Sequence, residues 1–289
     1  MRHVAKVTVV VGLTALLLAF LTCAAGAQTL TDSPQAQALV DQALALWADT
    51  KADVVGDRDL QAKTLLDQVV AQYPGTNQAA AALRHLAYGT YLKDLKDQAQ
   101  AYWDKLFKDY PTSKERGYAW TDQARFLAAK GDQAKALPLL EKVLKEFPKT
   151  DLEPDALFLT GDYLWVLRRF KDALAPLERV VAEYPNTTEA LRAHYVLGSI
   201  RTFQLTDDPN AALPHLAIVI AKEDVDPERV AWCYYMTALC YARLGDYASG
   251  VQPCKQVIEN YAKYPIIVGA AKNLLKWLEF HMPQGEAPK

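Results

Sequence analysis

The sequence has 289 residues, 32 of them Lys or Arg and 34 Asp or Glu, so its formal net charge is −2 at pH 7. A chain of this length with 51% hydrophobic residues can bury a large core. Charges of both signs are interspersed along it, whereas a nucleic-acid-binding protein needs a clustered Lys/Arg face, so we expect no nucleic-acid partner.

The N-terminus has the three parts of a secretory signal peptide. Arg2 and Lys6 precede an apolar run over residues 7–21, and residues 25–27 read Ala-Gly-Ala. This pattern predicts that residues 1–27 are a signal peptide, cleaved after residue 27. We therefore expect an exported, periplasmic protein. Its mature part would hold 30 basic and 34 acidic residues, a net charge of −4, because Arg2 and Lys6 are removed.

Two other fates of this segment also imply export, and both imply membrane attachment. Cys23 could carry a lipid, although the preceding Leu21-Thr22 lacks the small residue that lipoprotein signals place there. The apolar run could also stay as an uncleaved anchor, since no charge stands between Lys6 and Asp32.

An aromatic–proline pair recurs at a constant interval of 37 residues. The pairs are Tyr73-Pro74, Tyr110-Pro111, Phe147-Pro148 and Tyr184-Pro185. Between the last two pairs, residues 147–185 contain two amphipathic helical segments joined by a short turn. The chain is therefore predicted to be a repeat protein made of helix pairs.

Three further columns share this interval. A hydroxyl that would cap the first helix of each pair stands two residues after each proline, at Thr76, Ser113, Thr150 and Thr187. An alanine recurs in the second helix, at Ala62, Ala99, Ala136 and Ala173. Gly161 and Gly198 share a third column, where a small residue allows two helix backbones to approach closely.

These columns resemble the tetratricopeptide repeat (TPR). In residues 147–185 the small residue Gly161, the aromatic Phe170, the small residue Ala173 and the terminal Pro185 match the family in order and spacing. The family's period is about 34, and here three extra residues fall at the joint between repeats. That longer joint is similar to the repeats of bacterial envelope proteins, such as BamD-type assembly lipoproteins and Tol-Pal-associated coordinators.

The resemblance covers residues 32–265 and implies an all-α fold, a right-handed TPR-like α-solenoid of about six helix pairs. In chain order we expect a first helix from Pro34 to about Thr50 and a second ending at Gln72, then repeats ending at the successive prolines. Repeat five has a longer turn at residues 205–210, and Asp226-Pro227 opens repeat six. A capping helix at residues 266–282 and a disordered tail at residues 283–289 complete the chain. Prolines bend the second helices at Pro138, Pro176, Pro214 and Pro253.

No catalytic constellation is visible, and we expect no enzyme, no cofactor and no metal. The five histidines, His3, His85, His194, His215 and His281, lack metal-ligand spacing, and there is no G-x-S-x-G or P-loop motif. Three cysteines follow the signal peptide, at Cys233, Cys240 and Cys254. Either Cys254 forms a disulfide with one of the others, or all three are buried free thiols.

The candidate site is a surface on the first helices. When each first helix is numbered from nineteen residues before its alanine, and from Leu191 in repeat five, positions 4, 8 and 11 should pack inward, and positions 2, 5, 9 and 12 form a second stripe. The resemblance implies that this stripe faces a concave groove. Beside Trp47 in the degenerate first repeat, it contains Arg84, Tyr88, Tyr91, Tyr118, Arg125, Phe158, Asp162, Trp165, Arg192, Tyr195, Trp232 and Tyr235.

Aromatic residues and arginine are enriched in binding hot spots, so we expect this groove to hold a peptide segment or a partner protein. The resulting hypothesis is a non-catalytic scaffold or adaptor in envelope assembly or maintenance. Two alternatives are peptidoglycan strands stacking on Trp165 and Trp232, and an accessory subunit of an enzyme complex.

Overall fold

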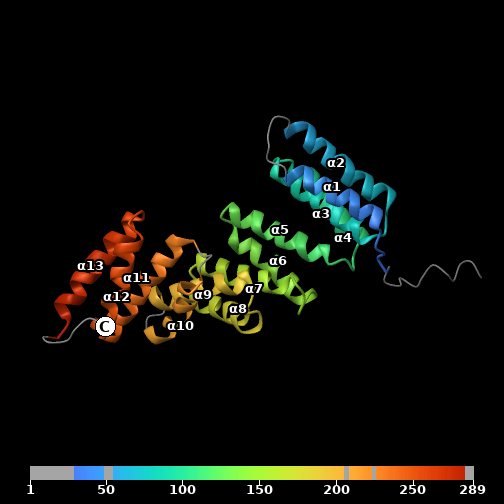
Figure 1. The fold of residues 1–289 in the computed structure, drawn as a ribbon. Coiled ribbons are helices and arrows are strands. Elements are labelled where there is room, and N and C mark those ends of the chain that lie inside the picture. Colours follow the sequence, from blue (N-terminus) through green and yellow to red (C-terminus); the bar gives the residue numbers. More distant parts are fainter. Residues whose placement is uncertain (1–28, 49–54, 205–207, 223–225, 284–289) are drawn as a thin grey trace, which may run out of the picture. The chain divides into compact units, whose positions relative to one another are not determined.

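A computed structural model of the chain describes residues 29–48, 55–204, 208–222 and 226–283, and in them it contains thirteen α-helices and one short 3-10 helix (Figure 1). The segment predicted to be a signal peptide (residues 1–27), with Cys23, and residues 284–289 of the predicted tail lie outside the described residues. The elements are α1 (Pro34–Ala48), α2 (Val55–Gln72), α3 (Asn77–Leu92), α4 (Lys96–Asp109), α5 (Glu115–Ala129), α6 (Gln133–Glu146), α7 (Glu153–Val166), α8 (Phe170–Glu183), α9 (Thr188–Phe203), η1 (Pro209–Ala211), α10 (Leu213–Ile220), α11 (Pro227–Leu244), α12 (Tyr247–Asn260) and α13 (Pro265–His281).

The helices form two compact units, Met1–Ala119 and Trp120–Lys289, and α5 contains the division. In the first unit α1 packs on α2, α2 on α3 and α3 on α4. In the second unit α7 packs on α8, α8 on α9, α9 on α10, α10 on α11, and α11 on α12. The first helices α7, α9 and α11 also contact one another in sequence, and α13 packs on α11 and α12. The fold is an all-α, TPR-like helical solenoid, as predicted.

The hydroxyl column closes the joints between repeats in two ways. Thr76 and Thr187 cap α3 and α9 as predicted, each accepting a hydrogen bond from the N–H three residues on, at 3.1 and 3.2 Å. Ser113 and Thr150 do not occupy the N-cap position of α5 and α7, and Thr150 accepts from the Leu152 N–H at 3.4 Å. The helices after these two joints begin one and two residues later than the hydroxyl column predicts.

Three of the four prolines that were predicted to lie inside second helices do so. Pro138, Pro176 and Pro253 lie inside α6, α8 and α12. Pro214 lies instead in the first turn of α10, because the longer turn of repeat five forms η1 and the helix begins only at Leu213. A proline in a first turn interrupts no helical hydrogen bond, so Pro214 does not bend its helix.

The small residues hold the paired helices close together. A Cβ atom on Gly161 would lie 2.7 Å from Cδ2 of Leu177 and nearer still to its Cγ, and one on Gly198 would lie 2.5 Å from Cδ2 of Leu216. Both leucines are fully buried. The alanine column is also fully buried, at Ala62, Ala99, Ala136 and Ala173. The predicted close approach of the paired helices is therefore confirmed at both glycines.

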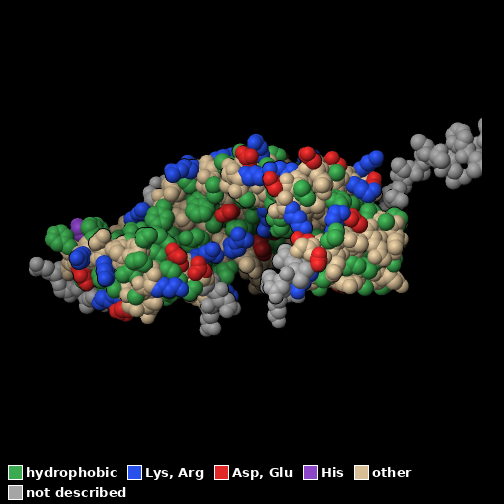
Figure 2. All heavy atoms as spheres, turned by 90° about the horizontal axis from the view of Figure 1, so that it is seen from above, with side chains coloured by type: hydrophobic (Ala, Val, Ile, Leu, Met, Phe, Trp, Pro, Cys, Tyr) green, Lys and Arg blue, Asp and Glu red, His purple; other side chains and the backbone are tan. Residues whose placement is uncertain are grey.

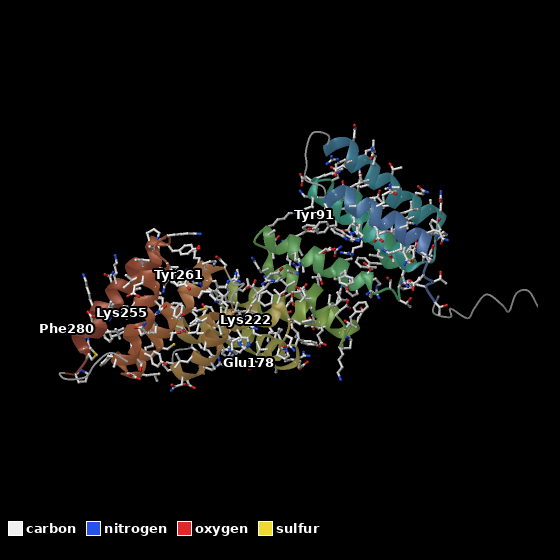
Figure 3. The ribbon with its side chains drawn as sticks, in the orientation of Figure 1. Tyr91, Glu178, Lys222, Lys255, Tyr261 and Phe280 are labelled. Atoms are coloured by element: carbon white, nitrogen blue, oxygen red, sulfur yellow. The ribbon has the colours of Figure 1, made fainter. Side chains whose placement is uncertain are left out.

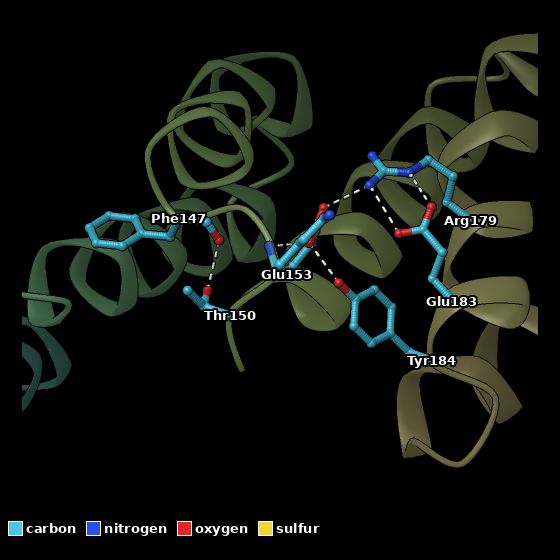
Figure 4. Close-up of polar contacts among 7 residues, drawn as sticks. Phe147, Thr150, Glu153, Arg179, Glu183 and Tyr184 are labelled. Atoms are coloured by element: carbon cyan, nitrogen blue, oxygen red, sulfur yellow. Dashed lines mark hydrogen bonds and ion pairs between the residues drawn. The ribbon is translucent and has the colours of Figure 1, made fainter.

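A buried carboxylate stabilises the joint before α7 (Figure 4). Glu153 is 3% exposed, and its side chain accepts hydrogen bonds from the Lys149 N–H at 2.5 Å, the Tyr184 hydroxyl at 2.6 Å and Arg179 at 2.7 Å. Burial disfavours the charged carboxylate, but these three donors outweigh it and hold the pKa of Glu153 below its usual value. Glu153 therefore connects the joint to the C-terminal end of α8.

We expect Gly161→Ala to lower the free energy of unfolding by about 1–3 kcal/mol, because the new methyl group must displace the buried Leu177. The matched control is Gly269→Ala in α13, where a Cβ atom meets nothing within 4 Å. There the gain in helix propensity should stabilise the protein by up to about 1 kcal/mol. Urea unfolding of both variants measures the two changes in the free energy of unfolding. Changes of the same sign would contradict the interpretation that Gly161 is in close contact with Leu177.

We expect Glu153→Gln to lower the free energy of unfolding by about 1.5–3 kcal/mol at neutral pH, because charge-assisted hydrogen bonds are lost in a buried place. The folded pKa of Glu153 is depressed, so its contribution is present above the ordinary carboxyl pKa of 4.5 and is lost as pH falls through the lower folded value.

The difference between native protein and variant should thus shrink in acid, which unfolding at a series of pH values measures. Glu178→Gln is the control, because that carboxylate pairs with Arg201 at a more exposed site and its loss should cost less than about 1 kcal/mol (Glu178 is labelled in Figure 3).

Candidate functional site

The predicted site residues of the first unit lie on α3 and on the start of α5. Arg84 forms an ion pair with Glu115 at 2.8 Å, and its guanidinium lies 5.2 Å from the centre of the Tyr118 ring. Tyr88 is 38% exposed, whereas the half-buried Tyr91 packs at 5.8 Å against the ring of Trp103 on α4. Arg84 is thus already engaged by a carboxylate of the same chain.

Trp47 does not face a groove in this structure. Its indole ring covers Gly89 of α3, where a Cβ atom would lie 3.1 Å from the ring. Trp47 therefore fills the contact between α1 and α3, and the prediction that its side chain faces the groove is wrong. The reason is that the stripe of one first helix is partly covered by the next first helix.

In the second unit, Arg125 also has an internal partner. Its Nη2 atom lies 2.6 Å from both carboxylate oxygens of Asp155 on α7. The two residues are 30 positions apart, so the pair joins one first helix to the next. The guanidinium edge that would grip a ligand carboxylate is occupied here.

Two arginines of α9 and α11 lie over aromatic rings of the preceding first helix. Arg192 stands 4.1 Å from the centre of the Phe158 ring, and Arg229 stands 5.2 Å from the centre of the Tyr195 ring. Each arginine is 34 positions after its ring. Phe158 is only 2% exposed beneath Arg192, so its prediction as a ligand-contacting residue is wrong.

The sequence prediction did not include Arg229. It lies 37 positions after Arg192 and so occupies the same column, but α11 is 18 residues long and its turn comes only at Gly245, in the left-handed conformation at φ 74°. Ala248 therefore stands 19 positions after Arg229, whereas Ala173 stands 18 positions after Asp155 in the same column, so counting back from the alanine places Arg229 one position outside the stripe. The interval of 37 counted directly from Arg192 would have found Arg229.

Asp162 lies near both of these arginines. It is half-buried on α7, and burial raises the pKa of its carboxyl, opposed by the charges of Arg192 and Arg229. The structure thus brings together Phe158, Asp162, Arg192, Tyr195 and Arg229, which we call the α7–α9–α11 face.

The remaining predicted residues are half-buried at the margins of this face. Trp165 lies on α7 near its C-terminal end. Trp232 meets Tyr235 edge-on, with ring centres 5.9 Å apart, and both rings also pack on the buried cluster that includes Ala231 and Val257. These two rings contribute to the core as well as to the surface.

The three cysteines lie in the interior of the second unit, where two of the histidines are half-buried. Cys233, Cys240 and Cys254 are buried free thiols, and burial raises the pKa of Cys233 and of Cys254 to about 12. His194 and His215 join α9 to α10, with their Nδ1 atoms 2.8 Å apart. Burial lowers the pKa of both, that of His215 to about 4, so the pair is neutral and one ring donates to the other.

The described residues contain no group of three or more His, Cys, Asp or Glu that could hold a metal ion. None of their helices has the length and apolar character needed to span a membrane. On the face shown in Figure 2, basic and acidic side chains are interspersed.

Comparisons with known proteins agree with the helix-pair geometry. One family model of the tetratricopeptide repeat matches residues 95–150 and 121–188, and a second matches residues 232–264. The chain contains tetratricopeptide repeats. Such repeats generally mediate protein–protein interaction, which makes this fold that of a protein-interaction scaffold. The finer resemblance to BamD-type lipoproteins stays a prediction.

Two solved structures share the TPR-type fold. PilW, described as a widely conserved type IV pilus biogenesis factor, has a TM-score of 0.56 and 16% identity, over 84% of this chain and 100% of that one. BtubC (BKLC) from P. vanneervenii has a TM-score of 0.52 and 13% identity, over 87% of this chain and 96% of that one. Among curated proteins, no sequence matches significantly. At these identities the likeness concerns the fold alone.

We expect the protein to lose stability as pH falls from about 6.5 towards 4. His85 and His215 have folded pKa values of about 4 against an ordinary 6.5, so the unfolded chain takes up protons first. His215→Gln removes one of these groups and should make unfolding midpoints less dependent on pH. Urea unfolding at a series of pH values across this range measures how the unfolding midpoint depends on pH. The same dependence in the native protein and in His215→Gln would contradict the prediction.

Proposed function

We propose that this protein is an exported, non-catalytic scaffold of the cell envelope that holds a peptide segment or partner protein on its first helices. The observation that carries the proposal is the α7–α9–α11 face, where arginine and aromatic side chains from three successive repeats meet. These are the residue types enriched in protein-binding hot spots.

The repeat architecture supports a scaffold function in a second way. First helices from successive repeats contact one another directly, so side chains at equivalent columns line up along the unit. An extended partner can then contact several repeats at once. The signal-peptide pattern of residues 1–27 supports export, and the similarity to PilW, a pilus biogenesis factor, is compatible with an assembly function in the envelope.

The peptidoglycan alternative has less support from the geometry. Sugar stacking needs an open ring face, and Trp232 packs both on Tyr235 and on the core. The absence of a catalytic motif in the sequence favours a scaffold over an enzyme, and leaves an accessory subunit as a special case of a scaffold.

Cross-linking capture from intact cells tests the proposal. We expect the variant Tyr195→Ala/Trp165→Ala to lose the captured partners, because it removes partly exposed aromatic area from the α7–α9–α11 face and its margin. Far-UV circular dichroism should stay unchanged in this variant.

The matched control is Phe280→Ala, which removes an 84% exposed ring at the C-terminal end of α13 (Figure 3). It should capture the same partners as the native protein. Equal capture by all three proteins would contradict binding at this face. If no protein is captured and purified sacculi sediment with the native chain only, the peptidoglycan alternative takes its place.

A further inference from the structure

Two arginines of the α7–α9–α11 face have no hydrogen-bond acceptor among the described residues. Arg84 and Arg125 form ion pairs with Glu115 and Asp155, as described above. In the described part of the chain, neither Arg192 nor Arg229 forms a hydrogen bond or an ion pair, and their contacts are the two aromatic rings.

The repeat register explains why Arg229 forms no ion pair within the described residues. Arg125 and Asp155 are paired across an interval of 30 residues between adjacent first helices. Thirty residues before Arg229 stands Ser199, which is uncharged and cannot form an ion pair. Thirty residues before Arg192 stands Asp162, which interacts electrostatically with both arginines but makes an ion pair with neither.

The two rings also bear on which part of each guanidinium a ligand can reach, since Arg192 and Arg229 lie 4.1 and 5.2 Å from the ring centres. A ring contacts the flat face of the guanidinium and leaves the N–H groups at its edge available. Those edges are the groups that bind a carboxylate through two parallel hydrogen bonds. Arg192 and Arg229 are therefore held by the rings without an ion pair in the described residues, and Asp162 acts on them only through its charge.

We propose that Arg192 and Arg229 bind the side-chain carboxylates of an acidic peptide segment of the partner, an inference that rests on the scaffold function proposed above. Phe158 and Tyr195 support the two guanidiniums from beneath. Asp162 competes with the partner for the same arginines, so it weakens binding in the native protein. The acidic neighbours Asp226 and Glu228 lie near Tyr195, and Asp226 is occupied in capping α11.

The test is fluorescence anisotropy of the purified full chain with a fluorescein-labelled peptide that alternates leucine and glutamate. The same peptide with glutamine in place of glutamate serves as the neutral probe. We expect the glutamate peptide to bind and the glutamine peptide to bind at least about tenfold more weakly, a difference of ~1.4 kcal/mol. Added salt should weaken the glutamate peptide selectively.

Two variants should change the affinity for the glutamate peptide in opposite directions. R192Q/R229Q should raise its Kd at least about tenfold, and Asp162→Asn should lower it, because a competing negative charge is removed. The control R168Q/R169Q makes the same change in net charge at exposed arginines of the α7–α8 turn and should leave the Kd unchanged.

Equal binding of the two peptides, no binding of the glutamate peptide, or an equal effect of both arginine pairs would overturn the inference. Tighter binding of inorganic polyphosphate than of a glutamate peptide of equal charge would also overturn it, by showing a phosphate site. Failure of the inference is distinguishable from failure of the scaffold function. If R192Q/R229Q captures partners from cells normally while Tyr195→Ala/Trp165→Ala does not, only the carboxylate assignment fails.

Discussion

The close approach of paired helices at Gly161 and Gly198 is the constraint on which the second unit depends. At each glycine a fully buried leucine of the second helix occupies the space that a Cβ atom would need. The facing alanine column is likewise fully buried, so little but backbone and methyl groups separates the two helices there. Large side chains cannot enter this contact, and the aromatic rings collect instead where one first helix meets the next.

The joints between repeats show how one sequence column can serve two different structures. Thr76 and Thr187 are followed three residues later by alanine, and their hydroxyls cap the helix at that N–H. Ser113 and Thr150 are followed three residues later by Arg116 and Glu153. Those longer side chains bond back to the joint themselves, Arg116 to the Pro111 carbonyl and Glu153 to the Lys149 N–H. A hydroxyl at a fixed interval therefore predicts a joint better than it predicts a cap.

The helices and their order followed from the sequence because the signals for them are local. The aromatic–proline pair at each joint, the Asp226-Pro227 helix start and the start of the final helix α13 are each signalled by a few adjacent residues. The state of a side chain on the candidate face depends instead on the neighbouring repeat. Nothing within α7 indicates that Arg192 covers Phe158. Counting intervals between repeats, rather than positions within one helix, would have indicated it.

That counting also shows how a scaffold of this kind can acquire a ligand site. Arg84 with Tyr118, Phe158 with Arg192, and Tyr195 with Arg229 are all 34 residues apart and all in cation–π contact. Arg125 and Asp155, 30 residues apart, form an ion pair. The stack repeats the same geometry. When one residue of an interacting pair is exchanged, the other residue keeps its place, and its charge or ring can then contact a ligand. Ser199 stands where the preceding repeat has Asp162, so Arg229 forms no ion pair in the described part of the chain, and a charge that elsewhere joins two repeats is available for the proposed partner.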